Sequence, residues 1–148
     1  MLCDAIEGND LDEVTRLLEA GANVDQIDFE HEATPLEKAA EERHAPAVEL
    51  LLDAGATPDR AMISPALLIA ATNGDADIAA LLLEAGASPD EPNEDGVTPL
   101  MGAAMSGHKP LVELLLASGA DPRQRARDGD NAHFVAANDE IRALLPPE

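Results

Sequence analysis

The sequence has 148 residues, of which 45% are apolar, and this is enough for a single domain with a core of its own. Its 30 Asp and Glu residues outnumber nine Lys and Arg residues, which gives a formal net charge of −21 at pH 7. A field of this sign repels nucleic acid and anionic lipid, excluding both as expected partners, and it attracts basic proteins. Because Phe29 and Phe134 are its only Phe, Tyr or Trp residues, the core must consist of aliphatic side chains, as in closely stacked helices.

The sequence shows no sign of a disulfide framework or a membrane anchor. Cys3 is the only cysteine, and no apolar run approaches the roughly 20 residues of a membrane helix. The first residues lack the basic start of a signal peptide. We therefore expect a cytoplasmic protein that is monomeric alone and is not inserted in a membrane; a periplasmic or secreted protein whose leader was removed stays an alternative.

In chain order, one six-residue motif recurs four times. It reads Leu-Leu-x-Ala-Gly-Ala at residues 17–22, 51–56 and 82–87, and Leu-Leu-Ala-Ser-Gly-Ala at 115–120. The glycines are 34, 31 and 33 residues apart. A period of this length indicates a repeat protein, in which each unit stacks on its neighbour and the stack presents an extended surface.

The clearest unit predicts two helices and a loop. Thr98, followed by a proline, predicts a capped helix that Gly107 ends by adopting a left-handed conformation. A second helix is predicted from near Pro110 to the stop at Gly119. Residues 90–97, rich in Pro, Asn, Asp and Gly, predict a tight projecting hairpin before the first helix.

These residues follow one another in an order that resembles the ankyrin repeat. The shared signatures are Thr-Pro-Leu at 34–36 and 98–100, paired alanines at 39–40, 70–71, 103–104 and 136–137, Gly-His at 107–108, and Asp-Gly at 95–96 and 128–129. The resemblance implies one all-α solenoid domain of helix-turn-helix units with projecting hairpin loops. Repeats are expected at about residues 1–27 (lacking its hairpin), 28–59, 60–92 and 93–125, with a truncated capping repeat at 126–148.

The sequence departs from the family pattern around the third repeat. Compared with the usual loop of the family, the loop that enters the second repeat is about one residue longer, and the loop that enters the third is about two residues shorter. Ser64 and Pro65 stand one place early, which predicts a shortened or distorted hairpin. The histidine usual after Thr-Pro-Leu is replaced by Glu37, Leu68, Met101 and Phe134. We expect weaker polar links between repeats as a result, without loss of the fold.

No pattern for catalysis, a cofactor or a metal is apparent. The histidines at 31, 44, 108 and 133 do not pair with one another or with Cys3 at ligand spacing, so no metal site is expected. His44 and His108 occupy the Gly-His turn position of the resemblance, where a hydrogen bond across the turn is implied. Residues 128–131 predict a hairpin turn rather than a calcium loop. We expect a protein that is not an enzyme.

The resemblance implies that the hairpin tips and the positions after the paired alanines line a concave groove that binds a partner. In this sequence those positions are Glu7, Glu30, His31, Glu41, Glu42, Met62, Thr72, Asn73, Glu94, Asp95, Val97, Met105, Ser106, Arg127 and Asp130. Most of the acidic excess lies in residues 1–60, at the N-terminal end of this groove. We expect a partner's Lys or Arg side chains to dock there, with an apolar contact at Met105.

Three alternatives follow for the biological role. The chain is expected to be a protein-binding module for a basic protein. It could instead be an immunity or inhibitor protein that masks a basic toxin or enzyme, or a scaffold or chaperone-like adaptor. Repeat ends such as residues 87–90 resemble those of bacterial ankyrin proteins. The cluster of Arg123, Arg125 and Arg127 is expected to be neutralised locally by neighbouring aspartates.

Overall fold

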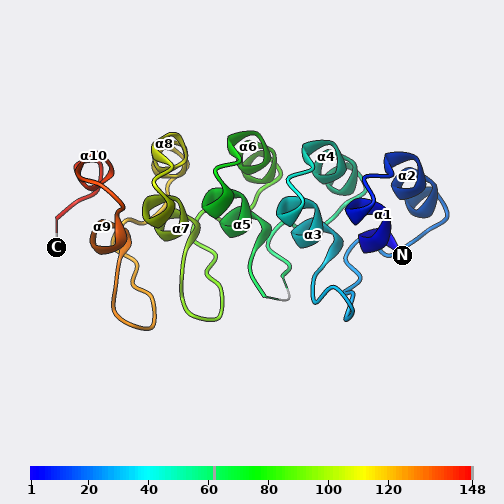
Figure 1. Ribbon diagram of the computed structural model, residues 1–148, viewed down its shortest axis with the longest axis horizontal. Coiled ribbons are helices and arrows are strands. Elements are labelled where there is room, and N and C mark those ends of the chain that lie inside the picture. The colour runs from blue at the N-terminus through cyan, green and yellow to red at the C-terminus, as the bar shows by residue number, and fades with distance from the viewer. Residues whose placement is uncertain (62, 148) are drawn as a thin grey trace.

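The computed structural model describes residues 1–61 and 63–147, and over these residues the chain is a row of paired helices (Figure 1). The pairs are α1 (Leu2–Glu7) and α2 (Leu11–Glu19), α3 (Pro35–Glu41) and α4 (Ala45–Asp53), α5 (Ala66–Asn73) and α6 (Ala76–Glu84), α7 (Pro99–Ser106) and α8 (Lys109–Ala117), and α9 (Ala132–Val135) and α10 (Asp139–Arg142). Within the described residues, the sole β feature is an isolated antiparallel bridge from Asp28 to Ala33. The expected all-α solenoid is confirmed.

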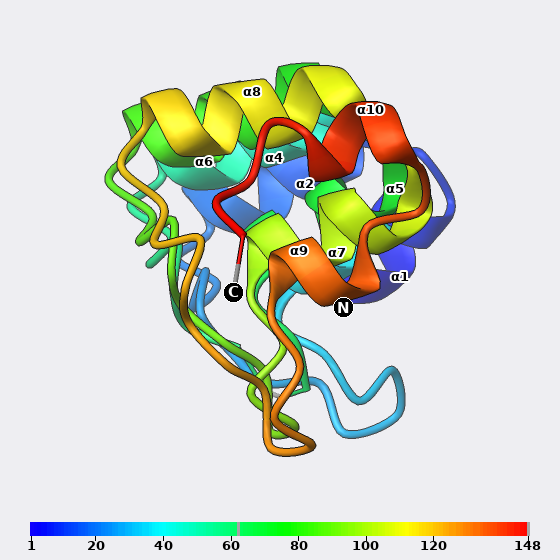
Figure 2. The ribbon, with the colours of Figure 1, turned by 90° about the vertical axis from the view of Figure 1, so that its left-hand side faces the viewer.

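The helices form two layers, and the loops project from one edge. The second helix of each pair lies in one layer and the first helix in the other, with the two termini at opposite ends of the row (Figures 1 and 2). Viewed along the row, the loop before α3 leaves the line of the other loops (Figure 2). None of the described helices is long and apolar enough to cross a membrane.

The core runs the whole length of the row because small and branched aliphatic residues recur at the same place in each unit. The paired alanines at 39–40, 70–71 and 103–104 are completely buried, which lets successive first helices approach closely. Leu51, Leu82 and Leu115 of the recurrent motif are also completely buried. Burial of each leucine side chain stabilises the fold by about 1.5–3 kcal/mol.

The helix ends predicted for the clearest unit are confirmed. The Thr98 hydroxyl accepts a hydrogen bond from the Met101 N–H at 3.3 Å and caps α7, and Gly107 ends α7 with φ +82°. The next helix, α8, begins at Lys109, one residue before Pro110. By contrast, α5 begins after Pro65 without a side-chain cap, because the Ser-Pro pair stands one place early.

Glu37 forms a strong polar link between repeats, so the expectation that loss of the family histidine weakens these links is wrong at this position. Glu37 is 1% exposed, and its Oε1 accepts hydrogen bonds from the Ile63 and Ser64 N–H groups at 3.0 and 3.2 Å. Its Oε2 accepts from the Thr34 N–H at 2.7 Å, within a capping box at the start of α3. One buried carboxylate thus ties α3 to the loop that leads into α5.

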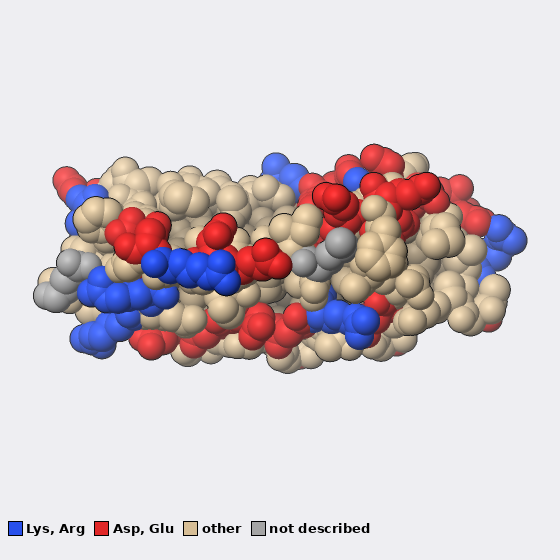
Figure 3. Space-filling view, turned by 90° about the horizontal axis from the view of Figure 1, so that it is seen from below, with Lys and Arg blue, Asp and Glu red and all other residues tan. Residues whose placement is uncertain are grey.

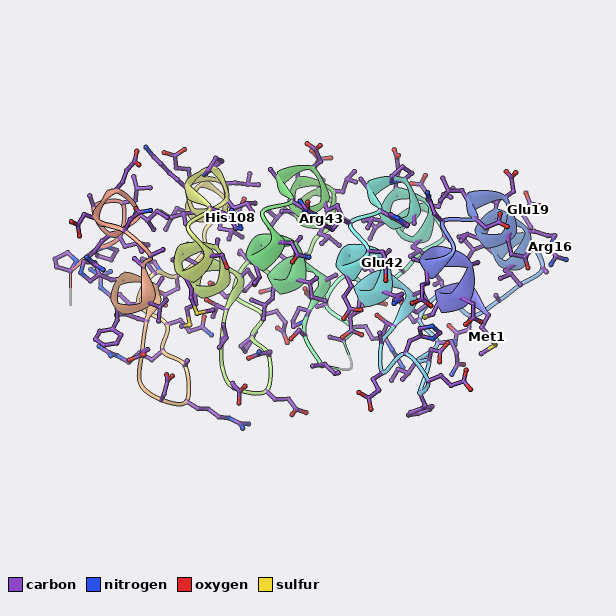
Figure 4. The ribbon with its side chains drawn as sticks, viewed as in Figure 1. Met1, Arg16, Glu19, Glu42, Arg43 and His108 are labelled. Atoms are coloured by element: carbon purple, nitrogen blue, oxygen red, sulfur yellow. The ribbon has the colours of Figure 1, made fainter. Side chains whose placement is uncertain are left out.

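Further polar links repeat along the row. Aspartates in successive loops each accept a hydrogen bond from a backbone N–H one unit later, in the pairs Asp25 with Thr57, Asp59 with Ser88, and Asp90 with Asp121. The Arg43 guanidinium reaches Asp75 of the next unit, with an N–O distance of 2.7 Å (Figure 4). His108 Nε2 lies 3.1 Å from the Thr72 carbonyl oxygen of the preceding unit, rather than bonding across its own turn.

Candidate partner-binding groove

A hollow of about 450 Å³ lies between the first helices and the loops in the middle of the row. Its lining comes from α3, α5, α7 and the neighbouring loops, and consists of Glu41, Ser64, Leu68, Ile69, Thr72, Asn73, Asn93, Val97 and Met105. Five of these residues, at 41, 72, 73, 97 and 105, were predicted from the sequence. The structure brings them together.

The sequence reasoning expected the apolar contact at Met105 but missed Leu68 and Ile69, the other two residues of the apolar floor. Leu68 and Ile69 lie on α5, and Met105 projects from α7 with 54% of its surface exposed. Leu68 stands where the family pattern has histidine, and this departure is the feature of the sequence that could have identified it as a groove residue. Asn93 was also missed; its side-chain oxygen accepts hydrogen bonds from Asp95 and Val97 N–H groups and so shapes the hairpin at the rim.

Close packing of α5 against α7 sets the shape of the floor. A Cβ atom placed on Gly102 would lie 2.6 Å from Thr72 Oγ1 and 2.8 Å from Leu68 Cδ1. Both distances are shorter than real Cβ contacts, so any larger residue here would force the Thr72 and Leu68 side chains to shift. The two helices therefore present Leu68, Thr72 and Met105 as one continuous surface.

Lys38 forms ion pairs with two of the predicted groove carboxylates. Its side chain lies almost buried on α3, and its Nζ is 2.8 Å from Glu42 Oε1 and 3.4 Å from Glu7 Oε1. Hydrogen bonds from His31 and then from Lys38 lower the pKa of Glu7 below its usual value. Glu7 and Glu42 therefore already have a cationic partner within the chain (Figure 4 shows Glu42).

Glu41 differs from its neighbours because its carboxylate has no ion pair or hydrogen bond within the described part of the chain. Surrounding protein atoms desolvate the carboxyl and raise its pKa, and repulsion from Glu37 and Glu42 adds to this effect despite the nearby Lys38. The side chain lines the hollow and still reaches solvent. Its charge is thus poorly compensated at a place that a partner can reach.

A family model for ankyrin repeats in three copies matches residues 64–146. This is more than half of the chain. The chain belongs to the ankyrin repeat family. Ankyrin repeats generally mediate protein–protein interaction and are typically non-enzymatic modules. No curated protein matched the sequence.

The remaining predicted residues of this ankyrin surface do not line the hollow; most lie on the loops, whereas Ser106 is the last residue of α7. Glu30, Glu94, Asp95, Ser106 and Arg127 are exposed, whereas His31 and Asp130 are half-buried, and Met62 lies outside the described residues. The Arg127 N–H donates to the Asp95 carbonyl oxygen at 2.9 Å, which joins the last two hairpins. Their role as partner contacts stays a prediction.

Charge is distributed unevenly over the loop side of the ankyrin row. Figure 3 shows Asp and Glu side chains crowded towards the N-terminal end, whereas groups of Lys and Arg side chains lie towards the C-terminal end. In that C-terminal group, the Arg125 guanidinium donates to the Gly129 carbonyl oxygen at 2.6 Å within its own hairpin. A partner lying along the groove would therefore meet the strongest negative charge at its N-terminal end.

Proposed function

We propose that this ankyrin domain binds a partner protein by taking one of the partner's Lys or Arg side chains into the central hollow. The observation that carries the proposal is the unpaired Glu41 carboxylate at the edge of a hollow whose other lining residues are apolar or polar but uncharged. No other residue of that lining carries a formal charge.

The chemistry of the hollow suits a long cationic side chain. The aliphatic stem of Lys or Arg can lie on Leu68 and Met105 while its charged head reaches Glu41, since such side chains commonly combine apolar and ionic contacts. Met105 can adapt to different stems because its side chain is flexible and polarisable. The ionised form of Glu41 is disfavoured in the free protein, and a partner's cation would stabilise it. This stabilisation would add to the free energy of binding.

A peptide selection tests this proposal with defined probes. Random 12-residue peptides selected on the purified domain should be enriched in Lys or Arg flanked by apolar residues. Affinity for the selected peptides should fall at least tenfold in Glu41→Lys and in Met105→Asp. The matched control is Glu49→Lys, which makes the same charge change at an exposed position on α4.

The outcome that refutes the proposal is equally defined. If the selected peptides lack basic residues, or if Glu41→Lys and Glu49→Lys bind them equally well, the central hollow does not recognise a cation. Reversal of Glu42 is less informative, because it would also break the ion pair with Lys38.

The inhibitor and scaffold roles predict different effects on the activity of the partner once it is known. An inhibitor that masks a basic enzyme or toxin should abolish that partner's activity at a one-to-one ratio, and Glu41→Lys should restore the activity. A scaffold or chaperone-like adaptor should bind the partner without silencing it. Measuring the partner's activity at saturating ankyrin domain separates the two.

A further inference from the structure

The N-terminal end of the row gathers three side chains that bind metal ions. Cys3 comes from α1, and Asp28 and His31 come from the loop before α3. One ligand atom from each lies within 4.8 Å of the other two. Cys3 is 1% exposed and Asp28 is 8% exposed, so the cluster is not a group of solvated surface charges.

The two nitrogens of His31 lie in different surroundings. Nδ1 is buried and lies 3.1 Å from Asp28 Oδ2, yet it makes no hydrogen bond of acceptable geometry within the described residues. Nε2 lies 3.4 Å from Glu7 Oε2 and 3.6 Å from Asp4 Oδ1. A metal-bound histidine has this arrangement, with one nitrogen on the ion and the other donating to a carboxylate that orients the ring.

A path from solvent reaches the cluster. A hollow of about 300 Å³ is lined by Cys3 and Asp28 together with apolar residues such as Met1 and Leu17. It is separate from the central hollow, with which it shares no lining residue. It gives solvent access to Cys3 and Asp28, whereas His31 is not among its lining residues.

We propose that Cys3 Sγ, Asp28 Oδ2 and His31 Nδ1 form a zinc site. Sulfur, imidazole nitrogen and carboxylate oxygen are the usual zinc ligands, and the thiol disfavours calcium and magnesium. Bond lengths of about 2.0–2.3 Å place tetrahedral ligand atoms roughly 3.3–3.6 Å apart, so zinc draws the three atoms together. Burial raises the pKa of the Cys3 thiol to about 12, and zinc must therefore displace the thiol proton to solvent.

A calorimetric titration of the tag-free, chelator-treated chain with zinc chloride tests the site. One zinc ion should bind per chain, and affinity should fall at least tenfold in both Cys3→Ser and His31→Gln. His133→Gln is the matched control, because His133 Nδ1 is also buried without a partner in the described structure but belongs to no such cluster. Its affinity for zinc should equal that of the unchanged chain.

Cobalt(II) supplies a readout that does not depend on the stability of a variant. A cobalt ion bound to the unchanged chain should give a thiolate-to-metal charge-transfer absorption, which is lost in Cys3→Ser. Far-ultraviolet circular dichroism should show unchanged helix content in the half-exposed His31→Gln. Equal zinc affinity in all variants, absence of one-to-one binding, or cobalt binding without the thiolate band would each overturn the proposal. Failure of the peptide selection would leave it untouched, because the two hollows are separate.

Discussion

Replacing Glu37 by glutamine isolates the contribution of one buried carboxylate to the stacking of two repeats. In the native chain, Oε1 accepts from the Ile63 and Ser64 N–H groups, and Oε2 accepts from the Thr34 N–H. Glutamine has the same shape but only one acceptor oxygen. Whichever way the amide turns, its NH₂ group faces an N–H donor, and at least one buried donor loses its acceptor.

The magnitude follows from that loss. A buried polar group without a partner costs about 1–3 kcal/mol, so Glu37→Gln should destabilise the fold by about 2 kcal/mol. With a urea m-value of about 1–3 kcal/mol per molar, the unfolding midpoint should fall by roughly 1 M. Circular dichroism at 222 nm is the suitable probe because the chain has no Trp and no Tyr.

Hydrogen exchange of backbone amides tests the same prediction residue by residue. Exchange at Ile63 and Ser64 should accelerate in Glu37→Gln, while the N–H groups inside α7 and α8 keep most of their protection. Glu49→Gln, an equal change of charge on an exposed face of α4, serves as the control. If the urea midpoints of the two variants agree within error, Glu37 does not hold the loop before α5, and the reasoning fails.

Three further changes probe the groove and the stacking. Gly102→Ala should destabilise the fold by about 1–3 kcal/mol through a clash with Thr72, although the same change in an exposed helix stabilises by about 1 kcal/mol; a raised midpoint in urea would contradict this packing. Arg43→Gln should lower the melting temperature at low salt by removing the ion pair to Asp75, and the difference should shrink at roughly 1 M NaCl. Because folding raises the pKa of Glu41, its charge opposes folding above that pKa; Glu41→Gln should therefore stabilise the fold at pH 7 by less than about 1 kcal/mol, with the gain lost as the pH falls through 4.5. A gain that persists at pH 3 would show another origin.

The scaffold was predictable because its determinants are local and repeat. A threonine cap, a glycine in the left-handed region and a run of leucines each act within one helix, and Thr98 and Gly107 do what their residue types favour. The 31- to 34-residue period then implies stacking. Glu37 was harder to interpret, because a glutamate after Thr-Pro-Leu predicts a capping box, whereas its second role depends on a loop 26 residues away.

The candidate site was only partly predictable, for the same physical reason. Repeat spacing predicts which positions face the groove, and three of them, Glu41, Thr72 and Met105, line the same hollow in the structure. It does not reveal which carboxylates are already neutralised, because Lys38 meets Glu7 across 31 residues of sequence. Nor does linear spacing bring Cys3 to His31, since their approach depends on how the loop before α3 folds back against α1.

The net charge of −21 and the charge that a partner meets are therefore different quantities. Several aspartates accept backbone hydrogen bonds between loops, Glu37 is buried, and Lys38 compensates Glu7 and Glu42. The full field acts at long range and sets the association rate, whereas the contact at Glu41 acts only in the complex. Glu41→Lys and Glu49→Lys change the net charge equally. They should slow association with a basic peptide to a similar extent, while only Glu41→Lys should accelerate dissociation. Equal dissociation rates would assign the recognition to net charge alone.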